Sequence, residues 1–301
     1  MSERIEIAGR SFKLSNPDKV LFPEAGATKR DLVNYYIRVA EFALTHWKDR
    51  PVSMERYPDG VTEEGFFQKN APDYFPDWIS LAELEKEGGS VHHVVADHPA
   101  TMAYLAAQGC ITPHLGLSRV DRIDRPDRLI FDLDPSGSDL SRLKGALRRV
   151  RDLLDRLNAR SFVQTTGSKG FHVIVPLDRS GDFDTVRTLA RRLADRLADE
   201  SPAELTVEQR KDKRGDRVFL DYLRNAYGQT SVAPYATRAR PEAPIATPLD
   251  WEEALGEAKP RDYTLGNIFR RLGQKGDPWA DIGRHAVSAD ALARRLGQLE
   301  S

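Results

Sequence analysis

The middle of the chain alternates between two hydrophobic periods. Short runs of adjacent apolar residues between turn-forming residues predict strands, whereas apolar residues three or four apart predict amphipathic helices. The predicted strands cover residues 128–134, 161–166, 171–177 and 217–222. The predicted helices have their apolar positions within residues 140–157 and 186–197. The resulting order, β-α-β-β-α-β, is that of the ferredoxin-like or split βαβ fold.

This order brings polar residues of the predicted strands together. In such a fold the first strand lies in the centre of the sheet, between the third and the fourth. Asp132 and Asp134 end the first strand and point to the same face, because side chains alternate along a strand. Their predicted neighbours are His172 on the third strand and Asp221 on the fourth. We therefore expect three carboxylates and a histidine to share one patch of the sheet.

The patterns on either side of the middle are less regular. Residues 16–26 indicate a loop, and a helix is predicted to begin at Thr28, with Asp31 in the capping-box position. Residues 66–90 mix aromatics, prolines and glycines and favour no single element. The remaining predicted elements are a strand at 91–95, a helix at 99–108, a proline-rich extended segment after residue 222, and helices at 250–256 and 289–299.

The charge of the chain is nearly balanced, with 45 Lys and Arg against 46 Asp and Glu and a net charge of −1. Nucleic-acid-binding proteins are often basic overall, but here the basic residues are clustered. An ordinary solvated surface explains any one cluster equally well. A lone cysteine, Cys110, provides neither a disulfide framework nor a thiolate metal cage. With no signal peptide and no membrane-spanning apolar run, we expect a cytoplasmic protein.

Two neighbouring carboxylates at the end of a strand repel each other unless a cation compensates them. Oxygen ligands suit Mg²⁺ or Mn²⁺, and two such ions support phosphoryl transfer. Asp221 would complete the ligand set. The alternative is that Asp132 and Asp134 only cap the following turn and helix. The D-x-D pattern also occurs in metal-dependent glycosyltransferases and in phosphatases with an aspartyl nucleophile.

The segment TTGSKGFH, residues 165–172, follows in the same predicted sheet. Its small residues and two glycines would let backbone N–H groups approach a phosphate, with Lys169 as a point charge. It is not a P-loop, because no Gly-Lys-Ser/Thr sequence opens a helix. A plain hairpin turn and a core role for His172 are the structural alternatives.

Taken together, these segments resemble the polymerase domain of the bacterial ligase D family, which acts in non-homologous end joining and belongs to the archaeo-eukaryotic primase superfamily. The three motifs are FDLDP, SKGFH and VFLDYLRN. The resemblance covers nearly the whole chain, and the more specific stretches are LSNPDKVLFPEAGATKRDLVNYY, GFFQKNAP and APYATRARPEAPIATPLDWEE. It implies an α+β primase-polymerase fold with a ferredoxin/RRM-like (βαββαβ) catalytic core and an N-terminal α/β module packed on it. We expect a single domain over 1–301, divided into an N-terminal module (1–120), the core (121–240) and a C-terminal wrap with helices (241–301).

The resemblance also implies roles for individual residues. Asp132, Asp134 and Asp221 would be catalytic and would bind two divalent cations, Mn²⁺ or Mg²⁺. The nucleotide-binding residues would be Ser168, Lys169, His172, Arg238 and His114. The DNA-binding residues would be Lys19 and Lys29, which grip a 5′-phosphate, and Phe66 and Phe67, which stack on the template. Without the resemblance, Phe66 and Phe67 would be assigned to the core and the two lysines to an ordinary surface.

The implied activity is that of a template-dependent DNA/RNA nucleotidyltransferase. It would fill gaps and extend ends at DNA breaks, with a preference for ribonucleotides. Expected partners are DNA with a gap, nick or double-strand end bearing a 5′-phosphate, an NTP or dNTP, Ku and a separate or fused DNA ligase, in the nucleoid-associated cytoplasm of a bacterium or archaeon. The alternatives are a primase or gap-filling polymerase outside end joining, and an inactive DNA-end-binding module.

The chain departs from the family pattern at a few places. In KDKRGDR, Gly215 stands one place early, which puts the pose of Arg214 in question. Glu55 stands where relatives often carry a basic or neutral polar residue. No ligase K-x-D-G sequence occurs, so we expect either a stand-alone polymerase or part of a longer chain.

Overall fold

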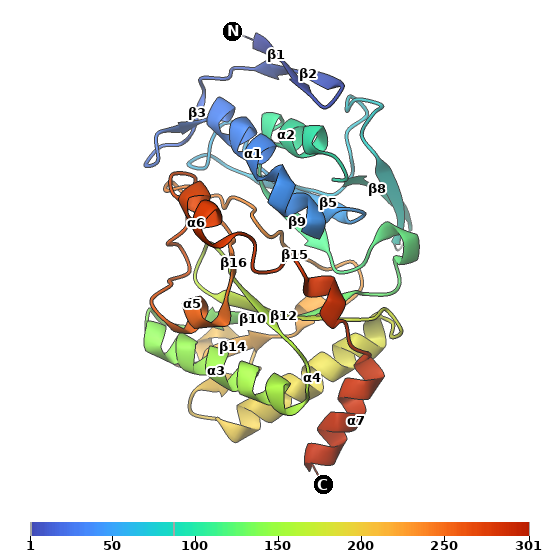
Figure 1. Ribbon diagram of the computed structural model, residues 1–301, viewed down its shortest axis with the longest axis vertical. Coiled ribbons are helices and arrows are strands. Elements are labelled where there is room, and N and C mark those ends of the chain that lie inside the picture. Colours follow the sequence, from blue (N-terminus) through green and yellow to red (C-terminus); the bar gives the residue numbers. More distant parts are fainter. Residues whose placement is uncertain (1, 87, 301) are drawn as a thin grey trace. The chain divides into compact units, whose positions relative to one another are not determined.

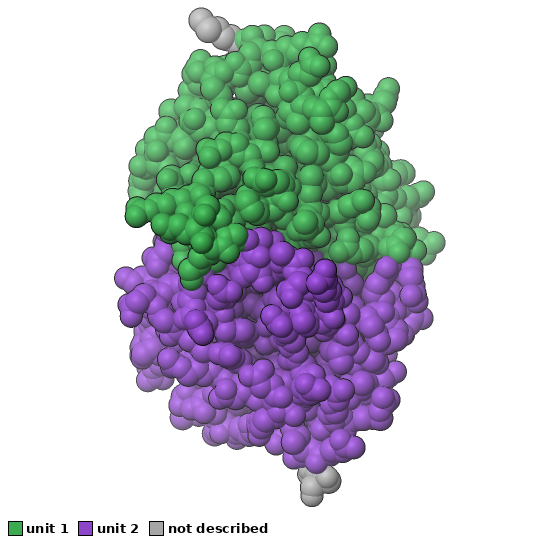
Figure 2. Space-filling view, in the orientation of Figure 1, with its two compact units in different colours: residues 1–121, 230–247, 263–276 green, residues 122–229, 248–262, 277–301 purple. Residues whose placement is uncertain are grey.

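The computed structural model describes residues 2–86 and 88–300. The chain forms two compact units, coloured separately in Figure 2. Unit 1 comprises residues 1–121, 230–247 and 263–276, and unit 2 comprises residues 122–229, 248–262 and 277–301. The predicted C-terminal segment, 241–301, is thus shared between the two units. No helix in the described part of the chain is long and apolar enough to cross a membrane.

Unit 1 contains a six-stranded antiparallel sheet in which β15, β9, β5, β8 and β7 follow one another and β6 also pairs with β5. The strands are β5 (Pro51–Arg56), β6 (Phe66–Gln68), β7 (Leu81–Lys86), β8 (Gly89–Val95), β9 (Cys110–Gly116) and β15 (Thr230–Val232). Its helices are α1 (Lys29–Trp47), α2 (Pro99–Ala107) and α6 (Ile268–Lys275). Two further strand pairs are β1 (Ser2–Ile7) with β2 (Arg10–Ser15), and β3 (Val20–Phe22) with β4 (Ala27–Thr28). The predicted loop at 16–26 therefore contains β3.

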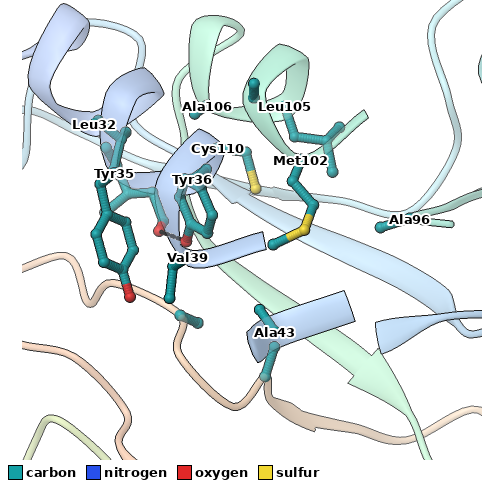
Figure 3. Packing of buried hydrophobic residues seen from close by; sticks show 14 of the residues in the cluster. Leu32, Tyr35, Tyr36, Val39, Ala43, Ala96, Met102, Leu105, Ala106 and Cys110 are labelled. Carbon is teal, nitrogen blue, oxygen red and sulfur yellow. Dashed lines mark hydrogen bonds between the residues drawn. The ribbon is translucent and has the colours of Figure 1, made fainter. Parts of the chain in front are cut away.

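The start of α1 follows directly from its sequence. Thr28 accepts a hydrogen bond from the Asp31 backbone N–H, and Asp31 accepts one from the Thr28 backbone N–H, which confirms the predicted capping box. The buried face of α1 packs against α2 and β9 in the core of unit 1. Figure 3 shows Tyr36, Met102 and Cys110 from these three elements pointing toward one another. The packing positions the body of α1, and the capping box defines its start, directly before Lys29.

Unit 2 contains a second six-stranded sheet with the order β13-β14-β10-β12-β11-β16. The strands are β10 (Arg128–Pro135), β11 (Phe162–Thr165), β12 (Phe171–Pro176), β13 (Leu205–Thr206), β14 (Val218–Asp221) and β16 (Pro248–Leu249). Its helices are α3 (Leu140–Arg156), α4 (Phe183–Glu200), α5 (Trp251–Leu255) and α7 (Ala289–Glu300). The predicted β-α-β-β-α-β order is confirmed, and β10 lies between β12 and β14 as expected.

The two long helices of unit 2 cover one face of this sheet (Figure 1). Each has a buried apolar stripe at helical spacing, and each begins at an aspartate N-cap, Asp139 for α3 and Asp182 for α4. Near the end of β10, buried Leu133 alternates with the partly exposed Asp132 and Asp134. The two aspartates therefore lie on the opposite face from Leu133.

Candidate active site

The three predicted carboxylates lie on neighbouring strands of unit 2. In the register of the sheet, Asp132 on β10 is paired with His172 on β12 and with Asp221 on β14. Asp134 shares its face with Asp132 and is paired with Phe219. The structure thus brings Asp132, Asp134, Asp221 and His172 together, as the strand order predicted.

Basic side chains contact each of these carboxylates. Arg214 Nη1 lies 3.6 Å from Asp134 Oδ2. Arg224 Nε lies 3.8 Å from Asp132 Oδ2 and 3.5 Å from Asp221 Oδ2. His172 Nε2 lies 3.5 Å from Asp132 Oδ1. Asp132, Asp134 and Asp221 form an acidic patch, and two arginines compensate part of its negative charge.

This compensation is incomplete. Burial raises the pKa of Asp134, and the neighbouring Asp132 raises it further, against the opposing effects of Arg214 and nearby lysines. Burial is also the largest cause of the raised pKa of Asp221, with a smaller contribution from Asp132. A cation bound among these groups would favour their ionised forms.

Two residues outside the predicted site hold this patch in place. Asn225, fully buried, accepts a hydrogen bond from the Ile130 N–H and donates one to the Ile130 carbonyl, each at 2.8 Å, tying the turn after β14 to β10. Arg214 donates to the carbonyls of Glu208 and Gln209, at 2.9 and 2.8 Å. The early Gly215 therefore leaves Arg214 well anchored.

The turn between β11 and β12 is organised by Thr166. Its Oγ1 accepts hydrogen bonds from the N–H groups of Ser168 and Gly170, both at 3.2 Å, and donates to the Gly170 carbonyl at 3.0 Å. A Cβ on Gly170 would lie 1.9 Å from the Leu133 carbonyl oxygen, so only glycine fits beside β10. Thr166 engages the N–H groups of Ser168 and Gly170 in this structure, and the expected approach of these groups to a phosphate stays a prediction.

Side chains near the same turn line a pocket of about 500 Å³. Ser168 and Lys169 line it on one side, and Arg261 donates from its Nε to the Ser168 carbonyl at 2.8 Å. Lys169 also lies close enough to lower the pKa of Asp134. His172 is buried, and its Nδ1 lies 3.3 Å from the Gln164 amide nitrogen. The ring is thus held between Gln164 and Asp132.

The two predicted DNA-binding lysines lie together in unit 1. The Lys29 N–H donates to the Lys19 carbonyl at 2.8 Å. Lys19 Nζ donates to the Pro58 carbonyl at 3.0 Å and pairs with Asp59. Lys29 is only 7% exposed, and its pKa is lowered mainly by burial and then by Lys19. Lys29 is therefore not an ordinary surface lysine, and the pair of lysines, whose charge Asp59 compensates only in part, is suited to an anion.

Phe66 and Phe67 are exposed at the surface of unit 1. They are 46% and 62% exposed on β6, so the assignment to the core is wrong. The guanidinium of Arg56 lies 5.5 Å from the centre of the Phe66 ring. The Phe67 ring lies 5.3 Å from the ring of His114. Exposed aromatic faces flanked by such groups suit base stacking.

His114 and Arg238, also in unit 1, share a neighbour in Glu55. His114 Nε2 lies 3.4 Å from Glu55 Oε2, and Tyr57 donates to Glu55 at 3.1 Å. Burial would raise the pKa of Glu55, but His114, Arg238 and Tyr57 together lower it. The unusual acid therefore lies against the basic side chains of His114 and Arg238.

Comparison with known proteins identifies the family. A sequence model described as "LigD, primase-polymerase domain" matches residues 28–279. The chain belongs to the LigD primase-polymerase domain family, a family of nucleotidyltransferases.

Curated LigD proteins agree with this assignment. The multifunctional non-homologous end joining protein LigD of Mycolicibacterium smegmatis is 32% identical over 283 residues, covering 93% of this chain and 37% of the relative. The bifunctional LigD of Bacillus subtilis is 31% identical over 291 residues, covering 96% of this chain and 47% of the relative. The chain thus spans less than half the length of these LigD relatives.

A solved structure of a LigD domain has the same fold. The polymerase domain of Mycobacterium tuberculosis ligase D, in complex with DNA, superposes with a TM-score of 0.84 at 31% identity. The match covers 91% of this chain and 98% of that one. The mixed α+β fold expected from the resemblance is confirmed, and the roles of individual residues stay predictions.

The donor set at the acidic patch fits the divalent cations expected of a LigD polymerase. Asp132, Asp134 and Asp221 offer only carboxylate oxygens, which Mg²⁺ and Mn²⁺ prefer. Over residues 2–86 and 88–300, however, no three His, Cys, Asp or Glu side chains are grouped closely enough to hold a metal ion. The carboxylates would therefore reorient to share a cation.

Arg224 also contacts this patch, although it was not predicted as a site residue. It follows Asp221 by three positions, and this spacing could have marked it as a neighbour of the patch.

Proposed function

We propose that this chain is a template-dependent nucleotidyltransferase that fills gaps and extends ends at DNA breaks, preferring ribonucleotides, in non-homologous end joining. The observation that carries the proposal is the placement of three carboxylates on β10 and β14 beside the β11–β12 turn, in a chain of the LigD primase-polymerase family. Its DNA substrates would be gaps, nicks or ends with a 5′-phosphate. Ku and a DNA ligase would be its partners.

At the acidic patch, Asp132, Asp134 and Asp221 would hold two divalent cations, Mn²⁺ or Mg²⁺. When bound, such ions activate an attacking hydroxyl and stabilise the leaving group in phosphoryl transfer. The charge of Arg214 favours the ionised form of Asp134, and Asn225 holds β14 in register with β10. These contacts pre-position the carboxylates, which is the main contribution a protein makes to phosphoryl transfer.

The nucleotide would be held by side chains more than by backbone. Lys169 supplies an exposed positive charge at the turn, and Ser168 supplies a hydroxyl. His172, held between Gln164 and Asp132, presents its ring at a fixed place in the sheet. For Arg238 and His114 we propose the nucleotide-binding role that the resemblance gives them.

Residues of unit 1 would contact the DNA without recognising a particular base sequence. Lys19 and Lys29 would bind the 5′-phosphate at the far side of a gap, since phosphate contacts fix register on any sequence. Phe66 and Phe67 would stack on template bases, a contact worth about 1–3 kcal/mol per base for any base. Both features suit a repair enzyme that must accept arbitrary ends.

The test is primer extension on 5′-phosphorylated gapped DNA with Mn²⁺, with ribo- or deoxyribonucleotides. The wild type should extend the primer, more efficiently with ribonucleotides, and a folded Asp132→Ala/Asp134→Ala variant should not. Gap binding without extension by the wild type would favour the inactive end-binding module. Synthesis on an unprimed template would favour the primase alternative.

A further inference from the structure

Arg224 stands out among the charged residues of the acidic patch. Its Nε contacts carboxylates on two different strands, Asp221 Oδ2 at 3.5 Å and Asp132 Oδ2 at 3.8 Å. Its side chain is 44% exposed. One guanidinium thus bridges β10 and β14 at the place where the proposed function requires a divalent cation.

The second arginine of the patch, Arg214, is held quite differently. Its side chain is 8% exposed, and it donates to two backbone carbonyls. Its guanidinium also stacks on the Phe219 ring, 3.8 Å from the ring centre. Arg214 is thus fixed by contacts other than its ion pair with Asp134. The half-exposed Arg224 can turn its charged head into water at little cost.

We infer that Arg224 is an internal counter-ion that occupies the cation position between Asp132 and Asp221 and leaves when a divalent cation binds there. This inference rests on the proposed function, because it takes these aspartates as metal ligands. A metal ion bound to both Oδ2 atoms would lie close to this guanidinium, and their like charges repel. Arg224 therefore lowers the metal affinity of the site while it keeps two repelling carboxylates together.

Two consequences follow for Arg224→Gln. The variant should bind Mn²⁺ more tightly, because no cation has to be displaced. Ion pairs of a half-exposed arginine are weak, so releasing two of them predicts roughly a 2- to 30-fold gain in affinity. Arg224→Lys keeps a positive charge and should return the affinity toward that of the wild type.

The measurement is Mn²⁺ binding, followed by the loss of the free Mn²⁺ electron paramagnetic resonance signal, without DNA or nucleotide. The matched control is Arg149→Gln on α3, because Arg149 is 42% exposed and pairs with Glu204 through two hydrogen bonds. Tighter binding by Arg224→Gln alone supports the inference. The inference is overturned if Arg224→Gln binds Mn²⁺ no more tightly than the wild type, while the wild type binds Mn²⁺ and Asp132→Ala/Asp134→Ala does not. That outcome would leave the metal site itself intact.

A second measurement does not depend on how the variant folds. In the wild type, titration with diamagnetic Mg²⁺ should shift the Nε–Hε resonance of Arg224 and change that of Arg214 much less. An Arg224 resonance that does not move while Mg²⁺ binds would overturn the inference. Absence of any divalent-cation binding by the wild type would overturn the proposed metal site and this inference with it.

Discussion

Replacing Lys29 by methionine separates the DNA-binding role of this residue from its effect on stability. Methionine has a similar length but no charge. Lys29 lies at the start of α1, is only 7% exposed, and is held near Lys19. A hydrogen bond to a charged group contributes about 1.5–3 kcal/mol. We therefore expect roughly 10- to 150-fold weaker binding to a gap with a 5′-phosphate, and almost no change for a gap with a 5′-hydroxyl.

The assay is fluorescence anisotropy with the two gapped DNAs over about 50–200 mM salt. Losing one phosphate contact should reduce the slope of log affinity against log salt by about 0.9 on the phosphorylated gap. Lys13→Met is the control, because Lys13 is an exposed lysine on β2 of the same unit. Equal losses on both DNAs would refute the phosphate-pocket assignment.

Lys29→Met is expected to stabilise the folded protein, although it weakens DNA binding. The lowered pKa of Lys29 shows that burial and Lys19 disfavour its charged form. A Lys with a lowered pKa makes the folded state less stable below its folded pKa, and this penalty fades as pH rises through that value. Lys29→Met should therefore raise the melting temperature at neutral pH. A clear decrease would mean that Lys29 contributes to folding rather than being retained for binding.

Three other perturbations test separate features. Phe67→Ala should weaken binding to template DNA by roughly 5- to 150-fold in anisotropy with the melting temperature unchanged, because Phe67 is 62% exposed; a large drop in melting temperature would restore the core assignment. Gly170→Ala should lower the free energy of unfolding by about 1–3 kcal/mol in urea titrations, because its Cβ would meet the Leu133 carbonyl; unchanged unfolding would contradict that clash. Cys110 should resist Ellman's reagent near pH 8 until guanidinium unfolds the protein, because burial raises its pKa to about 12; rapid reaction of the native protein would show that the core of unit 1 opens.

The sequence was most informative where contacts lie close together along the chain. The capping box at Thr28 involves residues three apart, and the alternation along β10 places Asp132 and Asp134 on one face. Together with the strand order of the ferredoxin-like fold, that alternation was enough to place His172 and Asp221 beside Asp132, as the register confirms.

The unit 1 sheet was harder to predict because its strands come from distant segments. The edge strand β15 pairs with β9, whose residues lie more than a hundred positions earlier. The burial pattern of β5 is nearly continuous, so it lacks the alternation that marks a half-exposed strand. The contact of Arg214 with Asp134 could not be read from the sequence either, because it depends on side-chain positions across β10 and β14. The exposure of Phe66 and Phe67 runs against their hydrophobicity, and only the family resemblance anticipated it.

The order in which the segments of unit 1 occur along the chain has a consequence for synthesis on the ribosome. Residues 1–121 emerge first, but Ile268 and Leu272 belong to the same hydrophobic cluster as α1 and are made much later. At a synthesis rate of about 5–20 residues per second, the interval between residue 121 and Leu272 lasts roughly 8–30 s. Strands β10, β11, β12 and β14, in contrast, lie within one continuous stretch. The middle of the chain can therefore complete its sheet first, and the nascent N-terminal third is the part that most needs chaperone protection.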